Sequence, residues 1–294
     1  MSDAKEQAQT EGAAGSDLSL IDQLLETSKV RPGDESYSIT KQGLQTFISS
    51  LVENNKAGDR VTAALADEMI AELDKKLCKQ VDAIIHNSDF QRLESSWRSL
   101  KFLVDRTNFR ENIKIQVMNV SKEDLLSDFE DAPEITKSGL YKNCYTAEFG
   151  QFGGQPFGAI IANYEFGPGS QDVALLKYCA SVSAMSHAPF IAAAGSQFFG
   201  LDDFTKLPDL KDLSSIFEMP QYTKWNGFRE SDDARNVGLV LPHFLLRTPY
   251  GPETVPAKTF NYQEDVSAGN SDFLWGNAAF AFDSRLTQSF ADYR

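Results

Sequence analysis

The spacing of hydrophobic residues divides the chain into a helical first part and a second part in which short apolar runs alternate with helices. From Val61 onward, apolar residues recur at helical spacing: Leu65, Met69, Leu73, Leu77, Val81 and Ile84. This pattern predicts one long helix, which ends at His86-Asn87. Ser88 and, three residues later, Gln91 form a capping-box pattern that predicts the start of a new helix.

The new helix carries an apolar face that is central to the interpretation. Its members alternate steps of three and four along the chain: Phe90, Leu93, Trp97, Leu100 and Val104. Side chains at this spacing share one face of a helix, so we expect the face to be packed against something. The protein's own core is the favoured candidate. A partner interface is the alternative, and it would involve Phe90, Leu93, Trp97 and Leu100.

The residues before these helices have a different composition. Residues 1–17 are rich in Ala, Gly, Ser, Gln and acidic residues without apolar periodicity, which is typical of a disordered tail. Residues 18–60 contain two short amphipathic pieces separated by the helix breaker Arg31-Pro32-Gly33-Asp34. We expect a flexible arm whose helices dock on a neighbour. The first piece supplies four more candidate interface residues, Leu20, Ile21, Leu24 and Leu25.

Four short apolar runs in the second part predict strands: Ile113–Val120, Phe157–Tyr164, Pro189–Ala193 and Val237–Leu241. Residues 172–187, between the second and third runs, predict a helix and therefore a βαβ unit. Residues 250–270 form a long connection, and residues 273–291 predict a terminal helix. The predicted fold class is α/β: a helical segment (61–110) follows the arm, and an α/β domain (111–294) holds a mixed, largely parallel sheet flanked by helices.

Composition and charge limit the possible partners. The 42 acidic and 28 basic side chains give a formal net charge of -14, which repels both phosphate backbones and anionic lipids. No apolar run approaches the length of about 20 residues that spans a bilayer, and the start lacks a signal-peptide pattern. We therefore expect no nucleic-acid binding, no membrane insertion and a cytoplasmic location. Cys78, Cys144 and Cys179 are expected to be free thiols.

A search for catalytic and cofactor-binding patterns yields weak candidates. The glycine-rich stretch 150–158 precedes a strand, whereas phosphate-binding loops follow one. Cys179 and His187 lie about 12 Å apart along the predicted helix, beyond hydrogen-bond reach. The remaining candidates are Cys144, the isolated His86 and His243, the acidic stretch 123–134, the loop Gly167-Pro168-Gly169-Ser170, and Glu165 at a strand end. Buried thiols, solvated acids and a helix cap explain them more simply, so no catalytic, metal or cofactor site is predicted.

Several segments resemble one known family. Phe90 to Leu100, with the sequence FQRLESSWRSL, resembles the segment that characterises the large contractile-sheath subunit of bacterial type VI secretion. The resemblance continues, in order, through Tyr164 to Gly167, His187 to Ala194, Gly238 to Pro242, Arg247 to Gly251 and Leu274 to Phe280. These segments cover nearly everything from about Val61 onward, and the chain is identified as the amino-terminal portion of such a subunit.

The resemblance implies a structural role. Family members pair with a small sheath subunit (TssB/VipA-like) and with copies of themselves around an inner tube protein (Hcp-like), on a baseplate. Contraction of this sheath propels the tube, and a sheath-recycling ATPase (ClpV-like) dismantles the contracted form. Such a subunit needs no cofactor.

Family members also continue well beyond this chain's last residue, so the sequence is expected to be truncated at its carboxy end. Two alternatives to a sheath subunit remain open. One is a cytoplasmic hydrolase or nucleotide-dependent enzyme with a site near Glu165 and Gly167. The other is a scaffold that binds the small subunit and does not polymerise.

Overall fold

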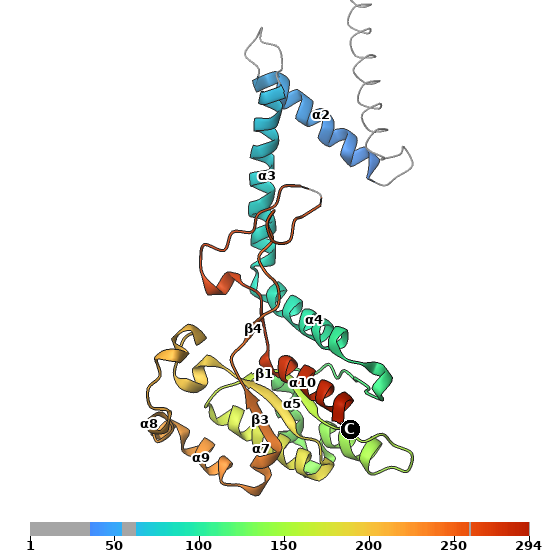
Figure 1. Cartoon of the computed structure of the whole chain (residues 1–294), viewed down its shortest axis with the longest axis vertical. Coiled ribbons are helices and arrows are strands. Elements are labelled where there is room, and N and C mark those ends of the chain that lie inside the picture. Colours follow the sequence, from blue (N-terminus) through green and yellow to red (C-terminus); the bar gives the residue numbers. More distant parts are fainter. Residues whose placement is uncertain (1–35, 55–62, 259, 294) are drawn as a thin grey trace, which may run out of the picture. The chain divides into compact units, whose positions relative to one another are not determined.

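The structure is a computed structural model of the whole chain, and it describes residues 36–54, 63–258 and 260–293 (Figure 1). The chain divides into two compact units, Met1–Gln80 and Val81–Arg294, which are described separately. The predicted tail 1–17 lies outside the described residues. So does the first amphipathic piece of the arm, with Leu20, Ile21, Leu24 and Leu25. The predicted domain boundaries stay predictions.

The first unit consists of helices. Helix α2 (Tyr37–Asn54) contains the second predicted amphipathic piece, which begins at Leu44. Helix α3 (Ala63–Ile85) confirms the long helix predicted from the apolar stripe, and it ends where expected. Four large aliphatic side chains on α3 are exposed: Ile70, Leu73, Leu77 and Ile84.

Helix α4 (Ser88–Arg106) follows directly, but its start differs from the capping-box prediction. The cap is Asn87, whose Oδ1 accepts hydrogen bonds from the main-chain N–H groups of Asp89 (3.0 Å) and Phe90 (3.3 Å). An Asx side chain one position earlier satisfies these free amides and makes Ser88 the first helical residue. The side-chain amide of Gln91 does not take part in a capping box; it donates to the main-chain carbonyl of Ser271 at 3.1 Å.

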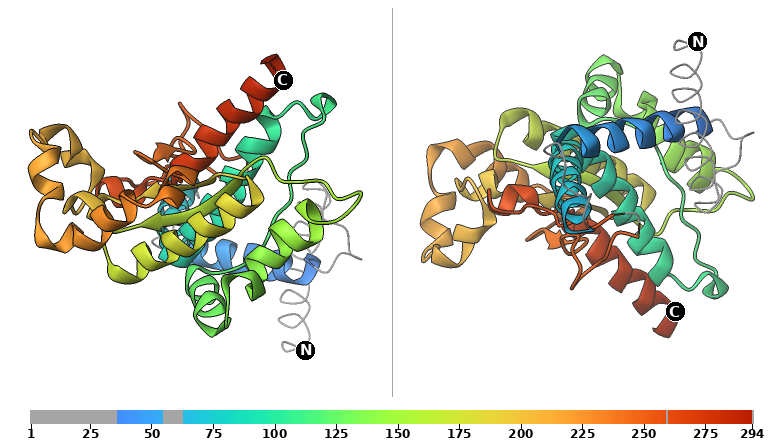
Figure 2. Two further views of the ribbon diagram at one scale, coloured as in Figure 1. Left: turned by 90° about the horizontal axis from the view of Figure 1, so that it is seen from below. Right: turned by 90° about the horizontal axis from the view of Figure 1, so that it is seen from above.

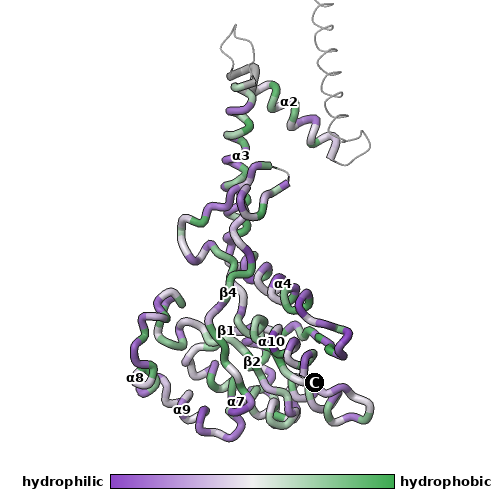
Figure 3. The backbone as a smooth tube through the Cα atoms, in the orientation of Figure 1, coloured by the Kyte–Doolittle hydropathy of each residue, from purple (hydrophilic) through white to green (hydrophobic). Residues whose placement is uncertain are grey.

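The second unit is built on a three-stranded parallel sheet. Strands β1 (Ile160–Phe166), β2 (Phe190–Ala194) and β3 (Val237–Val240) lie in that order. Helix α7 (Ser170–Ser186) connects β1 to β2, which confirms the predicted βαβ unit and the α/β class. All five residues of β2 are buried, as expected for the central strand of a parallel sheet. Figure 3 shows the hydrophobic character of the central strands.

The two faces of the sheet are covered by different helices. Phe190 and Ala192 of β2 join the core that includes Leu175, Leu176 and Cys179 of α7. Ile191 and Ala193 are buried on the opposite face, because side chains alternate along a strand. Helix α10 (Ala278–Tyr293) contacts all three strands and covers that second face, as Figure 2 shows.

The remaining elements complete the second unit. Helix α5 (Lys122–Asp131) packs on α7, and α6 (Gly139–Tyr141) continues directly into a π-helix (Lys142–Phe149). Helices α8 (Leu213–Phe217) and α9 (Thr223–Arg229) belong to the connection that leads along the chain from β2 to β3, and α9 packs on α7. The short strands β4 (Phe244–Leu245) and β5 (Trp275–Gly276) pair antiparallel.

Three predicted elements need correction. Residues 113–120 do not form a strand, because no neighbouring strand within the described part of the chain pairs with them. The strand predicted from Phe157 begins at Ile160 and continues to Phe166. The terminal helix begins at Ala278 instead of Phe273, because Trp275–Gly276 pair with β4 and the Asn277 side chain then accepts a hydrogen bond from the N–H of Ala279 (2.8 Å).

Candidate interaction surfaces

The apolar face of α4 is exposed, which overturns its interpretation as part of the core. Trp97 is 65% exposed and Leu93 56% exposed; Phe90 and Val104 are also exposed, and Leu100 is half-buried. The structure therefore brings four of the predicted interface residues, Phe90, Leu93, Trp97 and Leu100, together on one accessible helix face. We call this face, including Val104, the α4 stripe.

The side of α4 opposite the α4 stripe carries small side chains, and this side packs against the rest of the domain. The hydroxyl of Ser95 donates to the carbonyl of Trp275 at 2.6 Å, and Ser96 accepts a hydrogen bond from the Asn163 amide at 2.9 Å. Ser99 and Leu103 are fully buried on this side. Short serine side chains let α4 approach β5 and α10 closely, so the bulky residues are left facing outward.

A network of charged residues, largely buried, holds α4 to the long connection, and the sequence analysis missed it. The Arg247 guanidinium contacts Glu264 at 2.6 Å and Glu94 of α4 at 3.2 Å, and its side chain is only 7% exposed. Arg98 also pairs with Glu94, at 2.6 Å. Glu264 accepts further hydrogen bonds from the Tyr250 N–H (2.8 Å) and from His86 (3.2 Å). Glu94 and Arg98 stand four positions apart on α4, but no sequence spacing links Arg247, Glu264 and His86 to them.

The network sets the ionisation of its own members. Burial alone would raise the pKa of Glu264, but hydrogen bonds from Arg247, the Tyr250 N–H and His86 outweigh it, and the pKa is lowered. Burial works against the charged form of Arg247 as well, yet the hydrogen bond and charge of Glu264 raise its pKa. Both groups therefore stay charged. The α4 stripe is presented from a helix anchored by a fixed ion pair.

The two thiols considered for catalysis lie in the hydrophobic core. Cys144 and Cys179 are buried, and burial raises the pKa of both thiols, that of Cys144 to about 11. A thiol with a raised pKa is a poor nucleophile at neutral pH. His187 is the exposed residue that ends α7 in a left-handed conformation, with its ring against Phe149. His86 belongs to the charged network described above.

The region around Glu165 and Gly167 also has a structural explanation. The Gly167 N–H donates to the Asp172 carboxylate at 2.6 Å, and Lys122 pairs with the same carboxylate at 2.8 Å. The loop thus already holds an anionic group of the protein itself. Glu165 is exposed and lines a polar hollow of about 490 Å³ together with Asn163 and His243. Burial lowers the pKa of His243, and its ring packs against Trp275.

The acidic stretch 123–134 does not gather into a site. Asp124 and Ser121 cap the start of α5, where the Asp124 N–H donates to Ser121 at 3.0 Å. Asp128 accepts a hydrogen bond from the Gly139 N–H at 2.6 Å. Within the described ranges, no group of three His, Cys, Asp or Glu side chains could hold a metal ion. Among the helices that the structure describes, none has the length and apolar character needed to cross a bilayer.

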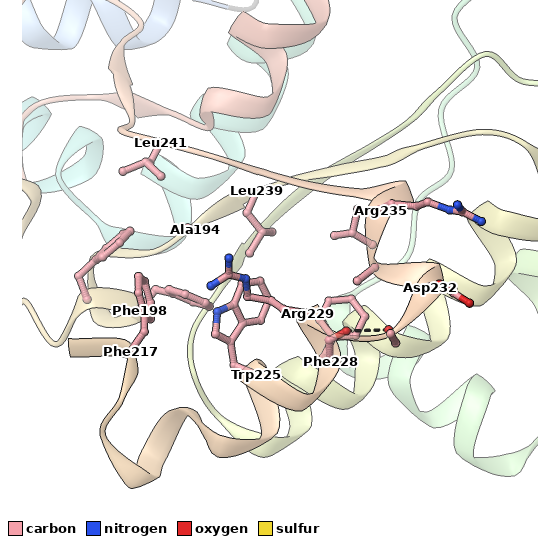
Figure 4. Close-up of a pocket in the computed structure, with 14 residues that line it drawn as sticks. Ala194, Phe198, Phe217, Trp225, Phe228, Arg229, Asp232, Arg235, Leu239 and Leu241 are labelled. Carbon is pink, nitrogen blue, oxygen red and sulfur yellow. Dashed lines mark hydrogen bonds between the residues drawn. The ribbon is translucent and has the colours of Figure 1, made fainter. Parts of the chain in front are cut away.

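A second apolar region lies beside β3. A groove of about 600 Å³ is lined by Leu239 and Leu241 on one side and by the rings of Phe198, Phe217 and Trp225 on the other (Figure 4). Arg235 lies at its edge, with the guanidinium pointing away from the groove.

Asp283 of α10 is a buried acid and leads to a testable prediction. It is 8% exposed, and burial raises its pKa from 3.8 to about 6. Below pH 4 the carboxyl of Asp283 is protonated in both the folded and the unfolded state, so its burial carries no charge penalty. As the pH rises through about 6 the buried carboxyl becomes charged, and the folded state loses stability. Asp283→Asn should therefore stabilise the protein at pH 7 by about 1–2 kcal/mol, after allowance for solvent screening.

Urea denaturation at pH 4, 5, 6 and 7 measures this difference. The stabilisation should grow across this range and vanish at the acid end. A constant difference between the two proteins at every pH would show that Asp283 is not responsible. Asp292→Asn, near the exposed end of the same helix, is the matched control and should change little.

The described residues thus form an α/β domain that presents apolar side chains on helix faces, a feature typical of proteins that act through contacts with other chains. Residues 67–294 match the family VipB, described as the EvpB/VC_A0108 tail sheath N-terminal domain. The chain belongs to this family.

A curated relative, the type VI secretion system sheath protein TssC1 of Pseudomonas aeruginosa, is 41% identical over 230 residues. The aligned region covers 77% of this chain and 46% of the relative, so the chain spans about half the length of the protein it matches.

Proposed function

We propose that this chain is the amino-terminal part of the large subunit of a type VI secretion contractile sheath and that it acts mechanically, without catalysis or a cofactor, in the bacterial cytoplasm. The observation that carries the proposal is the match of residues 67–294 to the tail sheath family. The exposed α4 stripe, held on a helix by buried ion pairs, supports a role based on contacts.

The proposed partners are the small sheath subunit and neighbouring copies of the large subunit. The sheath would surround the inner tube protein, stand on the baseplate, and be dismantled after contraction by the sheath-recycling ATPase. We assign the α4 stripe, with Phe90, Leu93, Trp97 and Leu100, to the contact with the small subunit. Leu20, Ile21, Leu24 and Leu25 are proposed as a second contact on the arm.

Co-expression of this chain with the small sheath subunit of the same bacterium tests the proposal. The two should co-elute as one complex in size-exclusion chromatography, and negative-stain microscopy then asks whether the complex forms hollow tubules. A complex without tubules would favour the scaffold that binds but does not polymerise. Separate elution of the two proteins would count against the whole proposal.

A further inference from the structure

The polar hollow of about 490 Å³ is lined by residues of the first half of α4, of β1 and of β5. Glu165 of β1 is one of these residues, and its carboxylate has no role in the fold or in the proposed function. The kind of group that the hollow can receive follows from the hydrogen-bonding capacity that its lining residues leave unused.

The amide nitrogens around the hollow are already bonded to the protein itself. The pairs are Asn163 with the hydroxyl of Ser96 (2.9 Å), Gln91 with the carbonyl of Ser271 (3.1 Å) and Asn277 with the carbonyl of Tyr164 (3.1 Å). The amide oxygens of Asn163 and Gln91, in contrast, accept no hydrogen bond from any residue that the structure describes. The amides thus leave acceptors facing a ligand, and a ligand must supply the donors.

The carboxylate of Glu165 is a third acceptor without a partner. Within residues 63–258 and 260–293 it forms no ion pair and no hydrogen bond. Lys122 lies close by, but its ammonium group pairs with Asp172 at 2.8 Å and donates to the main-chain carbonyl of Glu165 at 2.9 Å. Burial raises the pKa of Glu165, and the charge of Lys122 offsets this only in part. A cation brought to this carboxylate would stabilise its charged form.

The basic residues that line the hollow leave this carboxylate uncompensated. Arg92 pairs with Asp89 at 3.1 Å, and both side chains are largely exposed. Burial lowers the pKa of His243, so its ring is uncharged at neutral pH. The same ring lies against Trp275, with 4.1 Å between the ring centroids. His243 and Trp275 therefore give the hollow an aromatic wall and no charge.

A carboxylate, two amide oxygens and an aromatic wall suit the guanidinium group of an arginine. A guanidinium carries five N–H donors in one plane and stacks on aromatic rings, whereas an ammonium group carries three donors on a compact charge. An anionic ligand is disfavoured, because Glu165 would repel it.

The position of the hollow indicates which chain supplies the arginine. Gln91 and Arg92 line the hollow, and their neighbours along the helix, Phe90 and Leu93, belong to the α4 stripe. A partner that covers the first half of the stripe therefore lies beside the hollow. The formal net charge of -14 makes a basic side chain the electrostatic complement that such a partner would present.

We propose that the hollow receives an arginine side chain of the small sheath subunit, whose guanidinium pairs with Glu165 and donates to the amide oxygen of Asn163. This inference rests on the proposed function, because the small subunit is the partner assigned to the α4 stripe. The arginine fixes how the partner is oriented on α4, since a guanidinium binds its acceptors in one plane.

Isothermal titration calorimetry with the purified small subunit tests the assignment. Glu165→Gln keeps the shape of the side chain and removes its charge, so it should weaken the complex at least about 10-fold and reduce the salt dependence of the affinity. Unfolding of this chain alone should stay unchanged, because the carboxylate bonds to no described residue. Glu253→Gln, at an exposed position of the long connection, is the matched control and should leave the affinity unchanged.

A double-mutant cycle identifies the arginine. The arginines of the small subunit are replaced by methionine one at a time, and one replacement should reproduce the loss seen with Glu165→Gln. Combining that replacement with Glu165→Gln should cause little further loss, because both variants remove the same contact. Arg92→Met should leave the effect of Glu165→Gln in place. If Arg92→Met abolished that effect, Arg92 itself would be the counter-ion and the inference would fail.

Three other results would overturn the inference while the wild-type complex still forms and the proposed function stands. The first is an unchanged affinity for Glu165→Gln, and the second is an equal loss for Glu253→Gln. The third is weaker self-association of Glu165→Gln in sedimentation velocity with unchanged binding of the small subunit, which would assign the hollow to a second copy of this chain. Absence of any complex between the wild-type proteins would contradict the proposed function, and the occupant named here would fall with it.

Discussion

Replacing Arg247 by methionine is expected to lower the free energy of unfolding by about 3–5 kcal/mol, because a buried carboxylate then loses its counter-ion. The side chain of Glu264 is only 1% exposed, and two guanidinium contacts from Arg247 compensate its charge. Methionine keeps most of the volume of the arginine stem, so the loss is mainly electrostatic. Urea denaturation followed by tryptophan fluorescence measures it.

Two further variants identify the cause of this loss. Adding Glu264→Gln to Arg247→Met removes the orphaned charge and should recover part of the lost stability. Arg92→Met removes an ion pair with Asp89 in which both side chains are largely exposed, and it should leave unfolding nearly unchanged. Equal destabilisation by Arg92→Met and Arg247→Met would show that burial of the network is not the reason.

Trp97→Ala should weaken the complex with the small sheath subunit at least about 30-fold while leaving the fold intact. Large aromatic side chains at the centre of an interface typically contribute 2 kcal/mol or more, a figure that corresponds to about this fold-change. Trp97 is 65% exposed in the chain alone, so its removal costs little packing within the domain. Isothermal titration calorimetry with the purified small subunit gives the affinity.

The matched control for Trp97 is Phe152→Ala. Phe152 is an aromatic residue that is fully exposed in a turn outside α4, and its removal should not change the affinity. An unchanged affinity for Trp97→Ala, together with unchanged unfolding, would remove the α4 stripe from the interface. A loss of stability in Trp97→Ala would mean that the stripe packs within this chain after all.

Local patterns were enough to predict helices α3, α4 and α7 and the central strands, but they did not reveal the short helices α8 and α9. The apolar repeat from Met69 to Ile84 marked α3, and the apolar run at Phe190 marked the buried strand β2. Such elements depend on interactions between residues close in sequence or on a uniformly apolar run, and both are visible in the sequence. The resemblance in ordered segments likewise agreed with the family match over residues 67–294.

Features that depend on distant residues were decided by the tertiary structure. Periodicity placed Trp97 and Leu93 on one face of α4, but only the packing of Ser95 and Ser99 showed that this face points outward. The pair of Arg247 with Glu94 joins residues that are 153 positions apart, and no local rule predicts it.

The segment of residues 113–120 shows the same division most clearly. Its composition favours a strand, yet a strand forms only where a neighbour supplies hydrogen bonds, and no described residue does. The sequence by itself therefore determined which segments can form helices or strands, because these preferences are local. The tertiary structure alone decided which faces are buried, which charges meet and which edges stay open, because these depend on what the rest of the chain places beside them.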